Sequence, residues 1–188
     1  TQATTELKPV AEFTRDAWTS LYERYSTRVW RFAARLIGSD SSAVADVVQE
    51  TFLAAARNFE QFDESRGTHW SWLTGITHRQ VAMHWRRAAR NRAEPVAEEA
   101  SSADATTVPL ESAETAAIVR RVLAELPADS AALLTGKYCE GFTIVELREQ
   151  LGGTTEGTRS KLARARREFR MRYEKAGGTA AADSLREL

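Results

Sequence analysis

The chain has 188 residues, which is enough for one large or two small domains, and 26 lysines and arginines balance 26 aspartates and glutamates. This balance excludes a protein coated in positive charge, although it leaves room for local basic patches. The single cysteine, Cys139, excludes an internal disulfide, and its apolar neighbours predict a small buried residue in a protein of a reducing compartment.

Apolar residues recur at helical spacing through most of the chain, and this period predicts an all-α fold made of two small helical domains joined by a flexible acidic linker. Residues 1–12 are polar and predict an N-terminal tail. The first domain, residues 13–92, contains three predicted helices. The first begins near Phe13 and ends at Gly38, Asp40 or Ser41 caps the second, and the third runs from about Trp72 into a basic segment.

Residues 93–114 are rich in Glu, Ala, Ser and Thr and contain no Lys or Arg, a composition typical of a linker. The second domain, residues 115–175, begins with a predicted helix from Thr115 to Leu126. Thr143 and Glu146 form a capping box for a short apolar helix, which Gly152 and Gly153 end. Thr154 or Thr155 then caps a basic amphipathic helix, so these elements predict a helix-turn-helix. Residues 176–188 form a predicted C-terminal tail.

Basic residues gather in two segments, Arg79–Arg92 and Arg159–Lys175, with the acidic linker between them. Two tethered basic helices suit one extended polyanion, because the tether raises the effective concentration of the second contact. No apolar run is long enough to cross a membrane, and no signal-peptide pattern is present. We therefore expect a cytoplasmic, DNA-binding protein without membrane insertion.

Several short stretches occur in a fixed order from about Phe13 to Tyr173. They are Leu21–Tyr25, Asp46–Leu53, Phe62–Gly67 with Trp72-Leu73, Arg86-Arg87, Leu126-Pro127, Tyr138 with Glu140-Gly141, Glu146, Leu151-Gly152 and Ser160–Arg166. Together they resemble the extracytoplasmic-function (ECF) group of the bacterial sigma-70 family of RNA polymerase sigma factors. The resemblance implies that residues 13–92 are a sigma region 2-like domain and that residues 115–175 are a sigma region 4-like helix-turn-helix domain.

The resemblance implies a sigma factor that directs core polymerase to specific promoters and initiates transcription, with an anti-sigma factor as a further partner. Its core-polymerase-binding residues would be Asp46, Val47, Gln49, Glu50, Phe52 and Leu53. Its −10 element, including an unpaired base held in a loop pocket, would be read by Arg66, His69, His78, Arg79, Arg86 and Arg87. Its −35 element would be read by Thr155, Glu156, Thr158, Arg159, Lys161, Arg164 and Arg166.

The chemistry of these residues agrees with the implied roles. Carboxylates repel phosphate, so the helix with Asp46 and Glu50 suits a protein partner better than DNA. Arginine can bond guanine bidentately and glutamate can accept from cytosine, whereas Arg164 and Arg166 lie farther along the helix and are expected at phosphates. Departures from the family pattern are Arg148, Gln150, Thr135, Gly136, Met83 and Gly157.

The sequence leaves three other classes of protein as alternatives to this interpretation. An enzyme is not indicated, because the sequence has no Gly-rich phosphate loop, no metal-ligand cluster and no nucleophile–base arrangement; we expect neither cofactor nor metal. The alternative function is a helix-turn-helix transcriptional regulator that binds duplex DNA without polymerase, and the Asp46–Leu53 helix is the feature against it. A protein-interaction module with merely solvated basic faces is the third.

Overall fold

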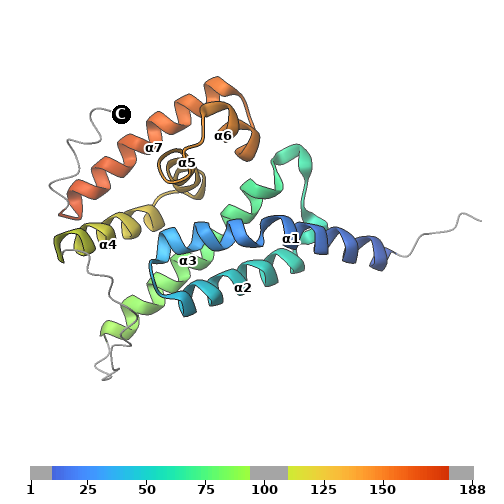
Figure 1. The fold of residues 1–188 in the computed structure, drawn as a ribbon, viewed down its shortest axis with the longest axis horizontal. Coiled ribbons are helices and arrows are strands. Elements are labelled where there is room, and N and C mark those ends of the chain that lie inside the picture. Colours follow the sequence, from blue (N-terminus) through green and yellow to red (C-terminus); the bar gives the residue numbers. More distant parts are fainter. Residues whose placement is uncertain (1–9, 94–109, 178–188) are drawn as a thin grey trace, which may run out of the picture.

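The computed structural model describes residues 10–93 and 110–177, and this part of the chain is helical throughout, without strands (Figure 1). The helices are α1 (Val10–Ile37), α2 (Ser41–Arg57), α3 (His69–Ala93), α4 (Leu110–Glu125), α5 (Ala128–Tyr138), α6 (Ile144–Leu151) and α7 (Thr155–Lys175), with 3-10 turns at η1 (Phe59–Gln61) and η2 (Glu64–Arg66). The predicted all-α class is confirmed for these residues. None of the described helices is long and apolar enough to span a membrane.

Three helix starts differ from the predictions. α1 begins at Val10 rather than near Phe13, α3 begins at His69 rather than near Trp72, and α4 begins at Leu110 rather than Thr115. The predicted linker therefore gives way to helix near its end. Residues 1–9, 94–109 and 178–188, which hold most of the predicted tails and linker, lie outside the described residues.

The predicted helix caps are present where a choice had been left open. Asp40, rather than Ser41, caps α2, and its carboxylate accepts the Ala43 N–H at 2.9 Å. Thr154 caps α7 by accepting the Gly157 N–H at 3.0 Å. In the capping box of α6, the backbone N–H and hydroxyl of Thr143 both donate to Glu146, and these bonds hold the pKa of that carboxyl below its ordinary value.

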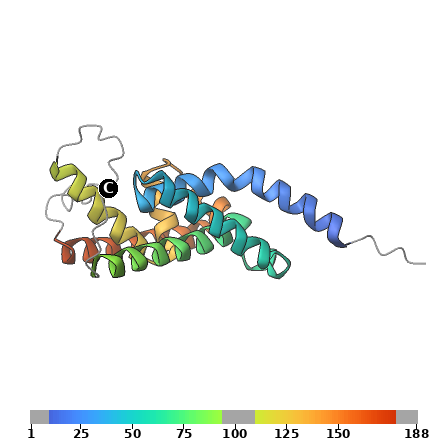
Figure 2. The same cartoon turned by 90° about the horizontal axis from the view of Figure 1, so that it is seen from below.

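Helices α1, α2 and α3 pack against one another around a buried aliphatic and aromatic core. Phe32 and Leu36 of α1, Val44 of α2, and Leu73 and Val81 of α3 are almost completely buried. The N-terminal end of α1 extends past the other helices, as Figure 2 shows. Burial of five large apolar side chains in this way supplies the main free energy that holds the three helices together.

Helices α4 to α7 form a second group in which α7 covers α4, α5 and α6. Gly136 permits α6 and the segment before it to pack closely on α5, because a Cβ at that position would lie 2.7 Å from the Leu147 side chain and 3.3 Å from that of Phe142. Gly136 is one of the departures from the family pattern. Phe142 and Leu147 fill the space that a larger side chain at this position would occupy.

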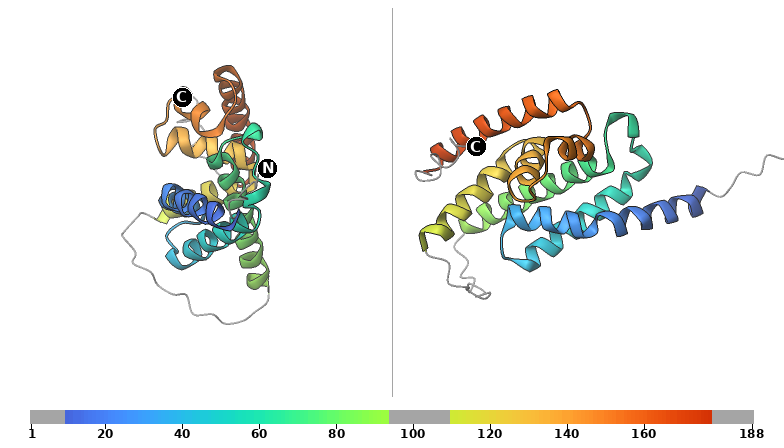
Figure 3. Two further views of the ribbon diagram at one scale, coloured as in Figure 1. Left: turned by 90° about the vertical axis from the view of Figure 1, so that its right-hand side faces the viewer. Right: turned by 45° about the horizontal axis from the view of Figure 1, so that its top comes forward.

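The two helix groups pack side by side, and their buried residues form one continuous apolar cluster (Figure 3). His78 of α3 is buried at this junction, with its Nε2 atom 3.2 Å from the carbonyl oxygen of Leu123 in α4. The predicted burial of Cys139 is wrong: the residue follows the last turn of α5 and is exposed. Tyr138 before it is also exposed and Glu140 after it is half-buried, so the turn that follows α5 lies at the surface.

Replacing His78 with glutamine is expected to flatten the dependence of the melting temperature on pH. Burial of the imidazole lowers the pKa of His78. The folded protein therefore keeps the ring neutral at a pH where the unfolded chain, whose histidine has the ordinary pKa of about 6.5, takes up a proton. The folded state therefore loses stability as pH falls below that value. Thermal melts between pH 7.5 and 5.5 measure this loss.

The His78→Gln substitution keeps an N–H that can donate to Leu123 and removes only the titration. His69 remains in both proteins, so its own titration cancels in the comparison. Equal slopes of melting temperature against pH in the two proteins would contradict the assignment of this loss to His78.

Candidate functional site

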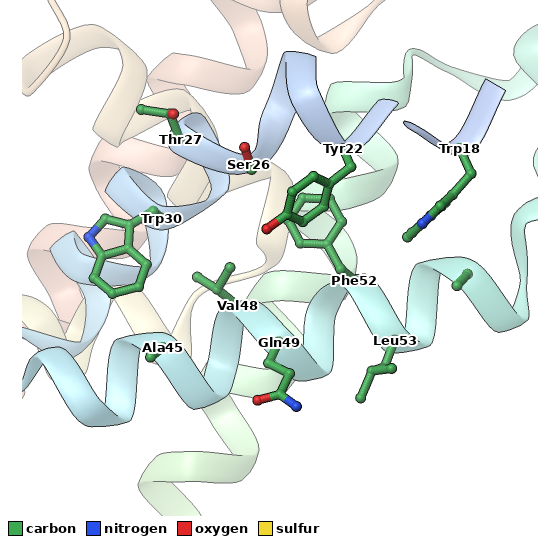
Figure 4. A pocket seen from close by; sticks show the side chains of 11 residues that line it. Trp18, Tyr22, Ser26, Thr27, Trp30, Ala45, Val48, Gln49, Phe52 and Leu53 are labelled. Carbon is green, nitrogen blue, oxygen red and sulfur yellow. The ribbon is translucent and has the colours of Figure 1, made fainter. Parts of the chain in front are cut away.

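An apolar groove of about 660 Å³ lies between α1 and α2 (Figure 4). Figure 4 shows Trp18, Tyr22 and Trp30 facing it from α1 and Phe52 from α2, and Leu53 of α2 also lines it. Tyr22, Trp30 and Leu53 are 48%, 40% and 40% exposed. Large apolar side chains left in contact with water around one concavity are typical of a surface that binds another protein.

The predicted polymerase-binding residues of α2 divide into two sets. Asp46, Gln49, Glu50 and Leu53 are exposed and share one face at helical spacing, with Gln49 and Leu53 lining the groove. Phe52 also lines the groove, although it is mostly buried. Val47 is 5% exposed and packs into the core, so its prediction as a contact residue does not agree with the structure. This face of α2 therefore has apolar side chains along the groove and the carboxylates of Asp46 and Glu50 beside it.

A second cavity, of about 310 Å³, lies where the η1–η2 loop meets the start of α3. Its lining consists of Gln61, Phe62, Asp63, Gly67, Thr68, Ser71 and Trp72. The Asp63 carboxylate accepts the Ser65 N–H at 2.9 Å and so fixes the turn beside the cavity. Aromatic faces with amide, hydroxyl and carboxylate groups at the margin suit a planar ring that carries hydrogen-bonding groups.

The predicted −10 residues are spread along α3 from this cavity. His69 lies with its ring 4.1 Å from that of Phe62 and is half-buried, and burial lowers its pKa. Arg79, Arg86 and Arg87 are exposed. These three arginines lie further toward the C-terminal end of α3 than the residues that line the cavity. The backbone of Arg66 ends η2, and its side chain lies outside the described residues.

One predicted contact residue on α3 is buried instead. His78, which was predicted to contact the −10 element, faces Leu123. Trp70 is 5% exposed, and Trp85 donates its indole N–H to the Leu36 carbonyl at 3.2 Å. Trp70 is therefore part of the core, whereas Trp85 is partly buried against it.

Helix α7 lies on the opposite side of the molecule from α2 (Figures 1 and 3). Arg159, Lys161 and Arg164 are exposed. Glu156 is exposed beside them, 3.8 Å from Arg159, and Thr155 begins the helix. Exposed cations within the first turns of a helix can reach a nucleic-acid groove.

Two predicted −35 residues have other roles. Thr158 is 4% exposed, and its hydroxyl donates to the Thr154 carbonyl, so its prediction as a base contact is wrong for this structure. Arg166 donates from Nε to the Tyr138 hydroxyl and lies over that ring. Arg166 thus ties α7 to α5, while Arg159, Lys161 and Arg164, which lie nearer the helix start, remain open to solvent.

The sequence reasoning missed Arg28 altogether. Its guanidinium lies 3.9 Å from the centre of the Trp70 ring and 5.5 Å from that of Phe142, and Nη1 donates to the side-chain oxygen of Gln150. Burial lowers the pKa of Arg28, which Glu140 and Tyr25 partly oppose. The one available signal was Gln150, a polar residue where the family pattern has a small or apolar one.

No group of His, Cys, Asp and Glu able to hold a metal ion occurs among residues 10–93 and 110–177. The acidic face of α2, the loop cavity and the basic face of α7 carry the exposed polar and charged groups described above. Groups on these surfaces offer hydrogen bonds, ion pairs and apolar contacts.

Comparison with known proteins gives matches over most of the chain. Residues 21–91 match the family model of Sigma-70 region 2. The ECF RNA polymerase sigma factor SigL of Mycobacterium tuberculosis is 30% identical over 163 residues, which cover 85% of this chain and 90% of SigL. SigM of the same species is 31% identical over 153 residues, covering 81% of this chain and 74% of SigM.

Two solved structures resemble the chain at a lower level. The sigma factor RpoE in its complex with the anti-sigma factor NepR from Bartonella quintana has 19% identity and a TM-score of 0.45, over 88% of this chain and 98% of the other. CnrH in complex with the cytosolic domain of CnrY has 26% identity and a TM-score of 0.45, over 84% and 87%.

Proposed function

Because the chain belongs to the ECF family of RNA polymerase sigma factors, we propose that it binds core polymerase and directs it to promoters with −10 and −35 elements. The similarity to SigL over 90% of that protein carries this proposal, since it includes both helix groups of the chain. Sigma factors are regulatory subunits, so the chemistry of transcription belongs to the polymerase. Because a sigma factor acts together with RNA polymerase, we propose a cytoplasmic location for this chain. We also propose an anti-sigma factor as a further partner.

The groove between α1 and α2 is the proposed polymerase surface. Its exposed tryptophan, tyrosine and leucine side chains supply apolar area, and Asp46 and Glu50 supply negative charge at the margin. An amphipathic basic segment of the polymerase would complement both features. A duplex DNA would not, because carboxylates repel phosphates.

The loop cavity and the start of α7 are the proposed DNA surfaces. One unpaired base would enter the cavity between η2 and α3, where Phe62 and Trp72 offer aromatic faces. Arg79 and Arg86 would hold the strand by its phosphates. On the second helix group, Thr155, Glu156 and Arg159 at the start of α7 would meet base edges in a major groove.

Transcription from a library of promoter fragments, with core polymerase and this chain as the sole sigma factor, tests the proposal. A sigma factor yields transcripts that start at a fixed distance from a shared pair of elements. The alternative, a helix-turn-helix regulator independent of polymerase, would instead shift duplex operator DNA alone and yield no transcript with core enzyme. Transcripts that require no particular promoter sequence would also contradict the proposal.

Arg159→Ala and Arg164→Ala are expected to weaken promoter binding in different ways. Loss of a base contact at Arg159 should cost about 1–3 kcal/mol and relax the preference for one base pair. Loss of a phosphate contact at Arg164 should weaken all sequences evenly and reduce the slope of log K against log salt by about 1. Binding titrations of polymerase holoenzyme on promoter variants at several salt concentrations measure both.

Exposed Arg121, which pairs with Glu125 on α4, serves as the matched control, and Arg121→Ala should leave both quantities unchanged. Unaltered base preference in Arg159→Ala would show that the start of α7 does not read the −35 element.

A further inference from the structure

The junction between the two helix groups holds the proposed DNA surfaces too close together for a promoter. The Thr68 hydroxyl, in the loop cavity, donates to the backbone carbonyl of Gln150 in α6. Five residue steps lead from Gln150 to Thr155, the start of α7, so chain connectivity keeps that start within about 20 Å of Thr68. Elements at −10 and −35 lie about 85 Å apart, at about 3.4 Å per base pair.

The length of α7 does not remove this conflict. A helix of 21 residues adds about 30 Å. The packed arrangement therefore cannot reach both elements of one promoter. Separation of the helix groups can, since seventeen residue steps from Ala93 to Leu110 span up to about 60 Å.

Arg28 makes a charge-assisted contact across the junction, in addition to the hydrogen bonds that Thr68 and His78 make across it. It projects from α1 between Trp70 of its own helix group and Phe142 of the other, and its guanidinium binds the side-chain amide of Gln150. A cation held over two aromatic faces and bonded to one amide oxygen is a directional contact, unlike the apolar packing around it. Its strength can therefore be changed without altering the core of either group.

We propose that the free chain holds itself in a closed, promoter-incompetent state through a clamp of Arg28 on Gln150 and Phe142, and that promoter recognition requires the clamp to open. This inference rests on the proposed sigma function. The clamp sets the fraction of open chains, and the apparent affinity for promoter scales with that fraction. The polar residue at position 150, which departs from the family pattern, makes the clamp a property of this chain.

Two substitutions at one position test the clamp in opposite directions. Gln150→Ala removes the acceptor and should lower the chain concentration for half-maximal transcription about tenfold. Gln150→Glu gives Arg28 a carboxylate partner and should raise that concentration. Small-angle X-ray scattering of the free full-length proteins should show a larger radius of gyration for Gln150→Ala only, with the wild type and Gln150→Glu matching the closed arrangement.

Arg28→Ala should behave like Gln150→Ala, and Arg31→Ala, an exposed arginine one turn along α1, should behave like the wild type. Circular dichroism checks folding; if Arg28→Ala loses helix, the two Gln150 variants decide. A wild type that is already open in solution, or a Gln150→Ala chain that opens without a gain in transcription, would overturn the proposal. If neither the wild type nor any variant supports transcription, although Gln150→Ala still shows the larger radius of gyration, the sigma function itself would be overturned.

Discussion

Leu53→Asp is expected to weaken binding of core RNA polymerase by about 30-fold, the effect of losing about 2 kcal/mol at an interface hot spot. Leu53 lies at the margin of the groove between α1 and α2 and is 40% exposed, so the change places a carboxylate against apolar side chains that a partner would cover. A buried carboxylate without a cation costs free energy that no neighbouring group of the groove returns. Binding of labelled chain to purified core polymerase measures the loss.

Ser42→Asp is the matched control, because Ser42 is exposed in the first turn of the same helix and does not line the groove. It should bind core polymerase like the wild type. Charge reversals Asp46→Arg and Glu50→Lys should act mainly on the association rate and its salt dependence. Wild-type affinity in Leu53→Asp would place the polymerase surface elsewhere on the molecule.

Ser71→Leu is expected to reduce promoter melting by tenfold or more, in keeping with about 1–3 kcal/mol for a stacked base. Ser71 lines the loop cavity, and its hydroxyl donates to the Thr68 carbonyl at 3.0 Å. A leucine side chain there would occupy space that the proposed unpaired base needs. Fluorescence of 2-aminopurine placed in the non-template strand of the −10 element measures melting by the holoenzyme.

Binding to core polymerase should be unaffected by Ser71→Leu, because the cavity and the groove have no lining residue in common. Ser20→Leu, at an exposed position on α1 outside both, provides a control for an added leucine. Normal melting with Ser71→Leu would contradict the assignment of the cavity to an unpaired base.

Local features of the fold were predictable because their causes lie within a few residues. The capping box of Thr143 and Glu146, the Asp40 cap and the Thr154 cap each depend on groups three positions apart. The buried stripe of Leu162, Ala165 and Tyr173 likewise follows from helical spacing. Arg159 and Arg164 are exposed for the same reason.

Errors arose where a residue's surroundings come from distant segments. His78 and Thr158 were predicted to contact DNA and Val47 to contact polymerase, yet all three are buried. A sequence gives the face of a helix that carries each residue, but not which other helix covers that face. Cys139 fails for a related reason, since apolar neighbours do not determine where a residue just past the end of a helix points.

By itself the amino-acid sequence determined the helical class, the caps, the acidic face of α2, the basic face of α7 and the family resemblance. These depend on residue types at short spacings. Only the tertiary structure decided that the two helix groups pack together, and that Arg28 meets Gln150, 122 positions away. Such a contact depends on the relative placement of whole helices, and that placement is set by many weak apolar contacts acting together across the junction.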